Sequence, residues 1–346
     1  MVSACALLGV IIICDLSRAD IPWIRCYNYK EKFSMNPVVD LLRREPWEHR
    51  VNSRTWPAGG YMTPSLSGLC HWWLENDYPV NDIQSLEIDQ APRMPILDSS
   101  YLNLFGVSSE RDIPRAVRLW QLTNTRYLLA GTDWEGPLNQ LGQPPNSFQT
   151  VMRMNVVPKP GIVQPEDSGD LTVQTNGAGN VALYEFTHAL PRARLYSDWK
   201  TVDDSKALQM LGSPEFDPEK TVLVAGDTPL TQVPVNAAAD PGSVKISHYQ
   251  SKDLVLEADA KTPAVLLLND RTGDFWNVWV DQQPAAVLRC NYIMRGVFVP
   301  PGHHIIEFRF QPSLTLFYVS VATFGLGILL AGFVLVTQFS FPHGGS

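Results

Sequence analysis

The sequence predicts an α+β fold, with a mixed α/β domain followed by an antiparallel, jelly-roll-like β-sandwich and a transmembrane helix. Helical and strand patterns alternate up to about residue 185, which is typical of an α/β layer domain. Seven short β-rich runs then follow Ser243 at roughly ten-residue spacing, as in a sandwich. Near the carboxyl end, Leu314 to Val336 carry no charged side chain, and a helix of about 23 residues crosses a bilayer.

These patterns divide the chain into five expected segments. They are a partial or short membrane segment at 1–14, the mixed α/β domain at 15–185, the β-sandwich at 186–312, the transmembrane helix at 313–337 and a tail at 338–346.

The composition is that of a globular protein with more than one hydrophobic core. Of the 346 residues, 45% are hydrophobic and 18% are charged, which is enough to bury two domains. The net charge is −8 and the basic residues are scattered, whereas a nucleic-acid binder carries a basic stripe along the phosphate backbone. Nucleic acid is therefore not an expected partner.

The five cysteines are Cys5, Cys14, Cys26, Cys70 and Cys290, and no two of them form a CxxC pair. This spacing excludes a zinc knuckle and a thioredoxin-like redox site. In an oxidising compartment Cys26, Cys70 and Cys290 could supply one disulfide, although their spacing does not identify the pair.

The amino-terminal residues Val2 to Cys14 are apolar and lack a basic region ahead of them. About 13 residues are too few for a comfortable membrane span, and a signal peptide ordinarily begins with basic residues. Two interpretations stay open: the end of a transmembrane helix whose earlier turns are missing, or an atypical signal or signal-anchor.

In the first domain the expected elements follow from caps and periodicity. Asn36 and Pro37 are typical of a helix start, and Pro46 ends the apolar run that follows. Later elements are expected to be a strand at 47–52, a helix at Pro114–Leu122 and a buried strand at Arg126–Ala130. Prolines and glycines between Gly131 and Gly179 predict a loop-dominated stretch, interrupted by a strand at Thr150–Val156.

A short helix and a series of strands are expected in the second domain. Asp203 and Asp204 precede the helix Ser205–Leu211, which Gly212 ends. The strands are expected at Lys220–Ala225, Val244–Tyr249, Leu254–Ala258, Ala264–Leu268, Phe275–Val280, Ala286–Arg289, Arg295–Val299 and Ile305–Phe310.

The last strand shows a two-residue period that fixes its register. Ile306, Phe308 and Phe310 share one face, and Ile305, Glu307 and Arg309 share the other. Burial of the apolar face therefore leaves the charged side chains on the opposite face.

Three segments resemble, in order, parts of the bacterial YfhO family of multi-spanning membrane proteins. The first is RAVRLWQLTNTRYLLAG, which looks like that family's helix and strand ahead of its sandwich. The second is ALPRARLYSDWKTVDDSKALQMLGSPEFDPEKTVLV, which looks like its strand, helix and strand linker. The third is FWNVWVDQQPAAVLRCNYIMRGVFVPPGHHIIEFRFQPS, which runs into a membrane helix. The resemblance covers residues 115–311 well and 15–114 more loosely.

The resemblance implies a glycosyltransferase of GT-C type, associated with glycosylation of cell-envelope polymers such as teichoic acids. In such enzymes a membrane helix bundle binds a polyprenyl-phosphate sugar, and an acidic residue in the first extracytoplasmic loop acts as base. This chain lacks the roughly ten preceding membrane helices and their acidic loop. It also carries FWNVWVDQQP where the family commonly has Gly-Trp and then Val-Asp-Gly.

Several acidic residues and histidines are candidates for catalytic or metal-binding groups. Asp15 and Asp20 follow an apolar segment, as a GT-C base would, but a water-exposed helix end explains them better. Glu75 and Asp77 flank Asn76 and could hold sugar hydroxyls or Ca²⁺, although calcium needs six or more oxygen ligands. His303 and His304 lie in PPGHH, where a strand would send neighbouring side chains to opposite faces and so prevent both from ligating one metal. We expect them in a solvated turn.

No motif of nucleotide, serine-hydrolase or zinc-protease chemistry is present in the sequence. We therefore expect no cofactor, no metal and no catalytic residue in this chain.

Ten tryptophans suggest glycan contacts, because the apolar faces of sugar rings stack on exposed aromatic rings. The candidates are Trp72, Trp73, Trp134, Trp276 and Trp279. Trp276 and Trp279 are expected on opposite faces of one strand, so at most one of the two faces solvent.

Two hypotheses about function follow. The first is the non-catalytic, extracytoplasmic part of a YfhO-like glycosyltransferase in the cell membrane. Its partners would be the lipid bilayer, other helices of a GT-C-like bundle, and a glycan or polyprenyl-phosphate sugar. The alternative is a self-contained, membrane-anchored binding or structural module built on the β-sandwich.

Overall fold

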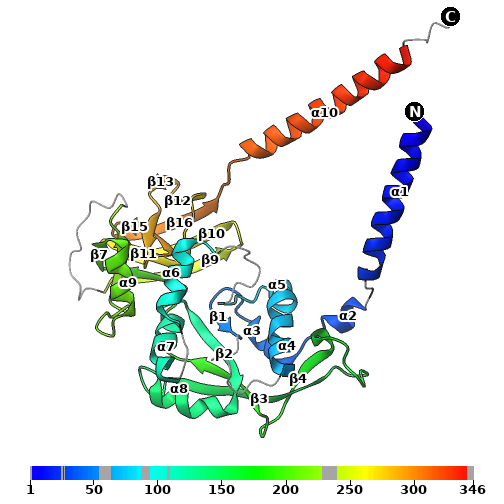
Figure 1. Ribbon diagram of the computed structural model, residues 1–346. Helices are drawn as coiled ribbons and strands as arrows, with labels where there is room; N and C mark the ends of the chain where they lie inside the picture. Colours follow the sequence, from blue (N-terminus) through cyan, green and yellow to red (C-terminus); the bar gives the residue numbers. More distant parts are fainter. Residues whose placement is uncertain are drawn as a thin grey trace, which may run out of the picture. The chain divides into compact units, whose positions relative to one another are not determined.

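The computed structural model describes residues 2–24, 26, 28–53, 64–86, 94–106, 110–227 and 240–340. The chain forms two compact units (Figure 1). The first comprises 1–92 and 107–189, and the second 93–106 and 190–346. The chain passes from the first to the second after Ala189, close to the expected boundary at 185, and the segment 93–106 adds a helix to the second unit.

The first unit is built around a five-stranded mixed sheet in the order β1-β2-β5-β3-β4. Its strands are β1 Arg50–Asn52, β2 Thr125–Gly131, β3 Phe148–Pro158, β4 Leu171–Thr175 and β5 Val181–Phe186. Its helices are α1 Val2–Asp20, α2 Tyr29–Lys32, α3 Pro37–Leu42, α4 Pro64–Trp72, α5 Tyr78–Val80, α7 Ile113–Leu122 and α8 Glu135–Leu141.

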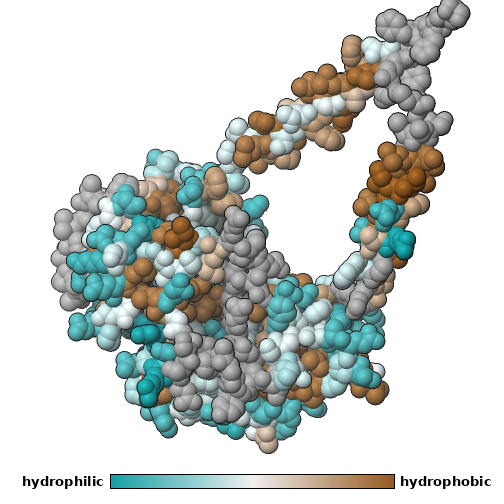
Figure 2. Space-filling model, viewed as in Figure 1, coloured by the Kyte–Doolittle hydropathy of each residue, from teal (hydrophilic) through white to brown (hydrophobic). Residues whose placement is uncertain are grey.

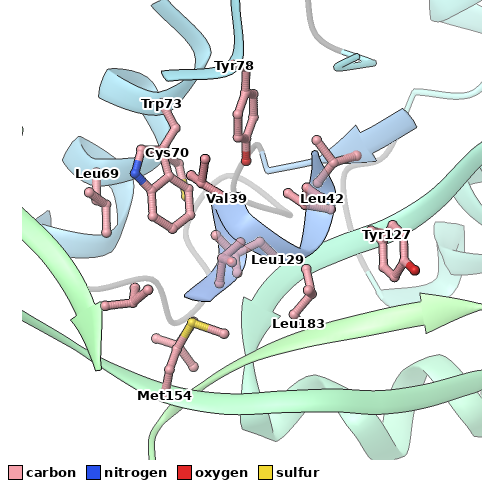
Figure 3. Close-up of a cluster of buried hydrophobic side chains, with 14 of the residues drawn as sticks. Val39, Leu42, Leu69, Cys70, Trp73, Tyr78, Tyr127, Leu129, Met154 and Leu183 are labelled. Atoms are coloured by element: carbon pink, nitrogen blue, oxygen red, sulfur yellow. The ribbon is translucent and has the colours of Figure 1, made fainter. Parts of the chain in front are cut away.

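Alternation along β2 places helices on both faces of this sheet. Tyr127 and Leu129 pack against α3 and α4 in one core (Figure 3), whereas Leu128 packs against α7 and α8 in a second core. Successive strand side chains point to opposite faces, so a strand apolar on both sides needs a helix layer on each. The predicted mixed α/β domain is therefore a three-layer arrangement.

Local signals placed several elements of the first unit correctly. The Asn36 side chain accepts hydrogen bonds from the backbone N–H groups of Val38 and Val39, at 3.1 and 3.0 Å, and so caps α3 as predicted. In 131–179 the predicted strand Thr150–Val156 is confirmed as part of β3, but the expectation that loops dominate the rest was wrong, because this stretch also contains α8 and β4. Pro137 lies in the first turn of α8, where a missing N–H leaves no backbone hydrogen bond unmade.

The second unit is a β-sandwich of two sheets. The first sheet has the order β13-β12-β16-β10-β9, and the second β6-β11-β15-β14-β8-β7. Their strands are β6 Ala193–Tyr196, β7 Asp198–Val202, β8 Thr221–Ala225, β9 Gly242–Tyr249, β10 Asp253–Ala260, β11 Ala264–Arg271, β12 Trp276–Val280, β13 Gln283–Ala285, β14 Leu288–Cys290, β15 Met294–Val299 and β16 Gly302–Phe310. The helices of this unit are α6 Ile96–Leu104, α9 Asp204–Gly212 and α10 Thr315–Ser340.

One apolar core lies between the two sheets. Leu256 and Phe308 from the first sheet pack in the same buried cluster as Leu266 and Val297 from the second. The pairing is antiparallel throughout the first sheet, whereas β7 and β8 of the second are parallel. The fold class is α+β as predicted, with one parallel pair at the edge of the second sheet.

Helix α10 is long and apolar enough to cross a membrane. Residues Thr315–Val334 form the candidate span, and α10 carries its apolar side chains exposed along its length (Figure 2). Helix α1 is also apolar and continues past the expected end at Cys14 to Asp20, with Leu8, Ile11 and Ile13 exposed. The tail expected from 338 begins inside α10, and residues 341–346 lie outside the described residues.

No disulfide links the cysteines whose side chains the structure describes. Cys14 and Cys26 are exposed, and Cys70 and Cys290 are buried, each as a free thiol. Burial raises the pKa of the Cys290 thiol to about 12, so it is a neutral core side chain. The disulfide considered among Cys26, Cys70 and Cys290 is not formed, and the side chain of Cys5 lies outside the described residues.

Charged side chains connect the two sheets at one end of the sandwich. Asp270 of β11 forms ion pairs with Arg192 at 2.6 Å and with Arg295 at 2.9 Å. The Tyr249 hydroxyl of β9, in the opposite sheet, contacts Asp270 at 3.1 Å and Arg192 at 2.6 Å. Burial lowers the pKa of Arg295, and the negative charge of Asp270 opposes that shift.

This arrangement predicts a large effect of Asp270→Asn. Neutralising Asp270 leaves two guanidinium groups buried without its charge, which costs about 3–5 kcal/mol. We expect the midpoint of urea unfolding to shift to a lower urea concentration. The full chain is unfolded in detergent micelles, and the transition is monitored by amide hydrogen exchange in β11 and β15. Asp259→Asn is the matched control, because its ion pair with His303 is exposed and contributes little. Equal midpoints for the two variants would contradict this account of the cluster.

Candidate functional site

The five tryptophans proposed as glycan contacts differ in exposure. Trp73 and Trp134 are 1% and 5% exposed and belong to the cores on the two faces of the first sheet. They cannot stack on a sugar, so their candidacy is withdrawn. Large aromatic side chains mostly fill hydrophobic cores, and no local sequence signal distinguishes a core tryptophan from one that contacts a ligand.

Trp72 is half-buried and its ring is covered. The Lys32 ammonium lies 5.2 Å from the ring centroid, and the Phe33 ring lies 6.2 Å away. A Cβ atom at Gly169 would come within 2.8 Å of the indole, so the backbone at this glycine packs directly on the ring. Trp72 therefore holds the turn 168–170 against α4 and offers no free face.

The ring of Trp276 is also covered by neighbouring side chains. Its ring centroid lies 3.5 Å from the guanidinium carbon of Arg295 and 5.4 Å from the ring of Phe310. Trp276 packs against the apolar core between the sheets, which is the inner face of β12. The prediction that Trp276 and Trp279 point to opposite faces is confirmed by this packing and by the surface position of Trp279.

Trp279 lines an open hollow of about 380 Å³ on the outer face of the first sandwich sheet, together with Gln282, Glu307 and Arg309. Trp279 on β12 pairs in register with Glu307 on β16. The Arg309 guanidinium lies 5.3 Å from the Trp279 ring and forms an ion pair with Glu307. The hollow thus combines one aromatic face with a carboxylate, a guanidinium and an amide.

The turn beside this hollow is under backbone strain. Asp281 and Gln282 form the two-residue connection between β12 and β13, with φ of 50° and 66°. A turn with both central residues at positive φ favours Asn-Gly or Asp-Gly, so Gln282 occupies a position where glycine is preferred. This is the position at which the sequence departs from the Val-Asp-Gly of the YfhO pattern.

Asp281 holds the strained turn on β16. Its carboxylate accepts hydrogen bonds from the Ile305 backbone N–H at 2.9 Å and from His304 Nδ1 at 2.6 Å. The hydrogen bond with His304 lowers the pKa of the Asp281 carboxyl. The next residue, Gln282, is exposed and lines the hollow together with Trp279.

The two histidines do not converge on a common ligand. They are the second and third residues of β16 rather than part of a turn, which corrects that expectation. His303 contacts Asp259 at 2.7 Å and His304 contacts Asp281 at 2.6 Å, so their side chains diverge as strand geometry requires. No group of three or more metal-ligating side chains occurs within the described residues.

The acidic candidates are also separated from one another. Glu75 is exposed and faces His71 at 3.6 Å, whereas Asp77 is 5% exposed at the end of the π-helical turn Trp73–Asp77. Asp15 and Asp20 are exposed on α1. Asp203 caps α9 by accepting a hydrogen bond from the Lys206 N–H, as predicted. None of these carboxylates lines the hollow.

Asp77 and Lys159 are buried near each other without forming an ion pair that shields the carboxylate. Burial raises the pKa of Asp77 to about 6, against the opposing effects of the Lys159 charge and the Trp72 indole N–H. Burial lowers the pKa of Lys159, whose ammonium donates to the Lys32 carbonyl. Lys32 in turn binds Asp167 and Asp170, each at 2.8 Å.

The chain has no match among the known proteins with which it was compared. The chain was compared with family models, with curated proteins and with solved structures, and none of the three comparisons gives a match.

Sequence reasoning identified Trp279 but not its three neighbours. Glu307 and Arg309 were assigned to the outer face by their alternation with Ile306 and Phe308, which the structure confirms. Their position beside Trp279 depends on β12 pairing with β16, two strands about 30 residues apart. No local pattern encodes that neighbour relation.

The raised pKa of Asp77 predicts that ionisation of its carboxyl lowers the free energy of unfolding at neutral pH. A group whose folded pKa lies above its unfolded value of 3.8 adds stability below that value and loses it as the pH rises through about 6. Asp77→Asn, which stays neutral, should therefore equal the parent chain near pH 3 and exceed it by about 3 kcal/mol at pH 7.5, because the shift from 3.8 to about 6 is about 2 pKa units at about 1.36 kcal/mol each. Urea unfolding of the first unit at both values measures this.

Glu75→Gln serves as the control for Asp77→Asn, because Glu75 is exposed on the same turn. A difference between Asp77→Asn and the parent that is the same at both pH values would contradict the assignment of the burial cost to Asp77.

Proposed function

We propose that this chain is a membrane-anchored, non-catalytic module that binds a glycan in the hollow formed by Trp279, Gln282, Glu307 and Arg309. The observation that carries the proposal is the composition of that hollow. The Arg309 guanidinium lies over one face of the Trp279 ring, and the C–H groups of a pyranose would stack on the opposite face. The carboxylate, guanidinium and amide beside it are hydrogen-bonding partners for hydroxyl groups.

The hollow is suited to binding rather than to glycosyl transfer or hydrolysis. Glu307 is the one carboxylate among its described lining residues, and glycoside hydrolysis ordinarily uses a pair of carboxylates on either side of the bond. The ion pair of Glu307 with Arg309 balances the charge, which favours a neutral glycan over a strongly anionic one. Exposure of Arg309 leaves it able to contact an acidic substituent.

The wider role follows from the resemblance to the YfhO family. We propose that the chain is the extracytoplasmic part of a cell-envelope glycosyltransferase of that kind, anchored in the bacterial cell membrane by α10. It would hold an acceptor glycan near the bundle that binds the polyprenyl-phosphate sugar. If the purified chain transferred sugar from such a donor without another protein, the non-catalytic role would be wrong.

The glycan site is tested by a single substitution. The full chain in lipid nanodiscs is applied to an array of hexose and N-acetylhexosamine oligosaccharides, and retained protein is detected by antibody. Stacking of a nucleic-acid base on an aromatic side chain contributes about 1–3 kcal/mol. With a similar free energy for a sugar ring on Trp279, Trp279→Ala should weaken binding about 5- to 150-fold. Trp279→Phe should retain part of the binding because it keeps an aromatic face.

Trp23→Ala is the matched control, because Trp23 is 85% exposed and lies outside the hollow. It should bind the array like the parent chain. Equal binding by Trp279→Ala, or an equal loss with Trp23→Ala, would contradict the site. A parent chain that binds no member of the array would favour an anchored structural module instead.

A further inference from the structure

The end of the β-sandwich from which the chain leaves for α10 carries an exposed aromatic side chain. Phe275, in the turn between β11 and β12, is 45% exposed. It is the one exposed large apolar side chain among the described residues between Leu190 and Gln311. Its ring packs edge-on against Phe310 at 5.9 Å, and the Trp276 ring lies 5.4 Å from Phe310.

The chain leaves the sandwich at this same turn. The Gln311 backbone N–H donates to the Phe275 carbonyl at 2.8 Å, and the Asn277 amide contacts the Gln311 side chain at 3.3 Å. Helix α10 begins at Thr315, four residues later. Even fully extended, four residues span about 14 Å. The turn that carries Phe275 therefore stays close to the start of α10, whatever direction the helix takes.

The start of α10 is itself aromatic. Phe317 and Tyr318 are exposed, with ring centroids 5.8 Å apart. Aromatic rings gather where membrane helices meet water, and the headgroup layer on each side of the hydrocarbon core is about 5–8 Å thick. A helix anchored at this level keeps the exit end of the sandwich within about 14 Å of this layer.

We propose that this end of the β-sandwich contacts the lipid headgroup region, with the Phe275 side chain inserted in the bilayer that α10 crosses. The proposal rests on α10 spanning the membrane and not on glycan binding. Two further side chains of this end, Lys252 and Asp274, are exposed and of opposite charge, so the contact is not selected by lipid charge. The insertion of an aromatic ring is the feature that fits a lipid surface.

The opposite end of the sandwich would then face away from the membrane. Strand β16 runs from Gly302 to Phe310, and nine strand residues span about 30 Å. Lys261, in the turn between β10 and β11, lies at that far end, because Ala260 pairs with Gly302. It provides a position on the same sandwich at which no lipid contact is expected.

Photo-crosslinking of the full chain tests the proposal. Benzoylphenylalanine is introduced singly at positions 275, 261 and 324 of chains reconstituted in vesicles of phosphatidylcholine and phosphatidylglycerol, and adducts are identified by mass spectrometry after illumination. Phe324 lies within α10 and reports on insertion of the helix itself. We expect lipid adducts at positions 324 and 275 and none at position 261.

The outcomes separate the contact from the anchor. Lipid adducts at 324 without adducts at 275 would overturn the contact and leave the anchor in place. Protein adducts at 275 in place of lipid adducts would overturn it in favour of a second polypeptide. Absence of lipid adducts at 324 would remove the anchor and the contact together. Lipid adducts at 261 equal to those at 275 would show unspecific labelling and overturn the contact as well.

Discussion

The structure depends on the fact that α10 has no face suited to water. Its 26 residues include no charged group, and the apolar side chains that the structure describes along it are exposed. A helix that is apolar all round is stable only when buried in protein or lipid. No residue of the candidate span Thr315–Val334 is buried in the protein. Lipid is the solvent that satisfies both its side chains and its internally hydrogen-bonded backbone. The β-sandwich is joined to that helix by a short linker, which limits how far its exit end can lie from the membrane.

The alternation of side chains in β12 and β16 connects the anchor to the candidate site. The inward residues Val278, Ile306 and Phe308 form the core, and the same register turns Trp279, Glu307 and Arg309 outward. Trp279 pairs with Glu307, three residues from Phe310, so the hollow lies about 10 Å along the strand from the exit end. A glycan in the hollow and a lipid surface at the exit end therefore do not compete for the same side chains.

The fold class and many element positions could be predicted from the sequence because their causes are local. The Asn36 cap, the Asp203 cap and the two-residue period of β16 each depend on a few adjacent residues. Within 131–179 the predicted strand Thr150–Val156 lies inside β3, whereas α8 and β4 were missed because the prolines of this stretch were taken as general breakers. The Asp270 cluster and the neighbours of Trp279 could not be predicted, since both depend on pairings between distant strands. The same holds for Trp72, whose covering residues Lys32 and Gly169 are far from it in sequence.

The central claim is that lipid surrounds α10 and that water surrounds the sheets of the two units. Flotation of the full chain with liposomes after an alkaline carbonate wash, followed by proteolysis of the floated vesicles, tests it most directly. The account predicts that the chain floats and that mass spectrometry finds a protected fragment beginning close to Thr315. Recovery of the intact chain in the carbonate supernatant, or digestion of α10 at the same rate as the exposed turns of the sandwich, would contradict it.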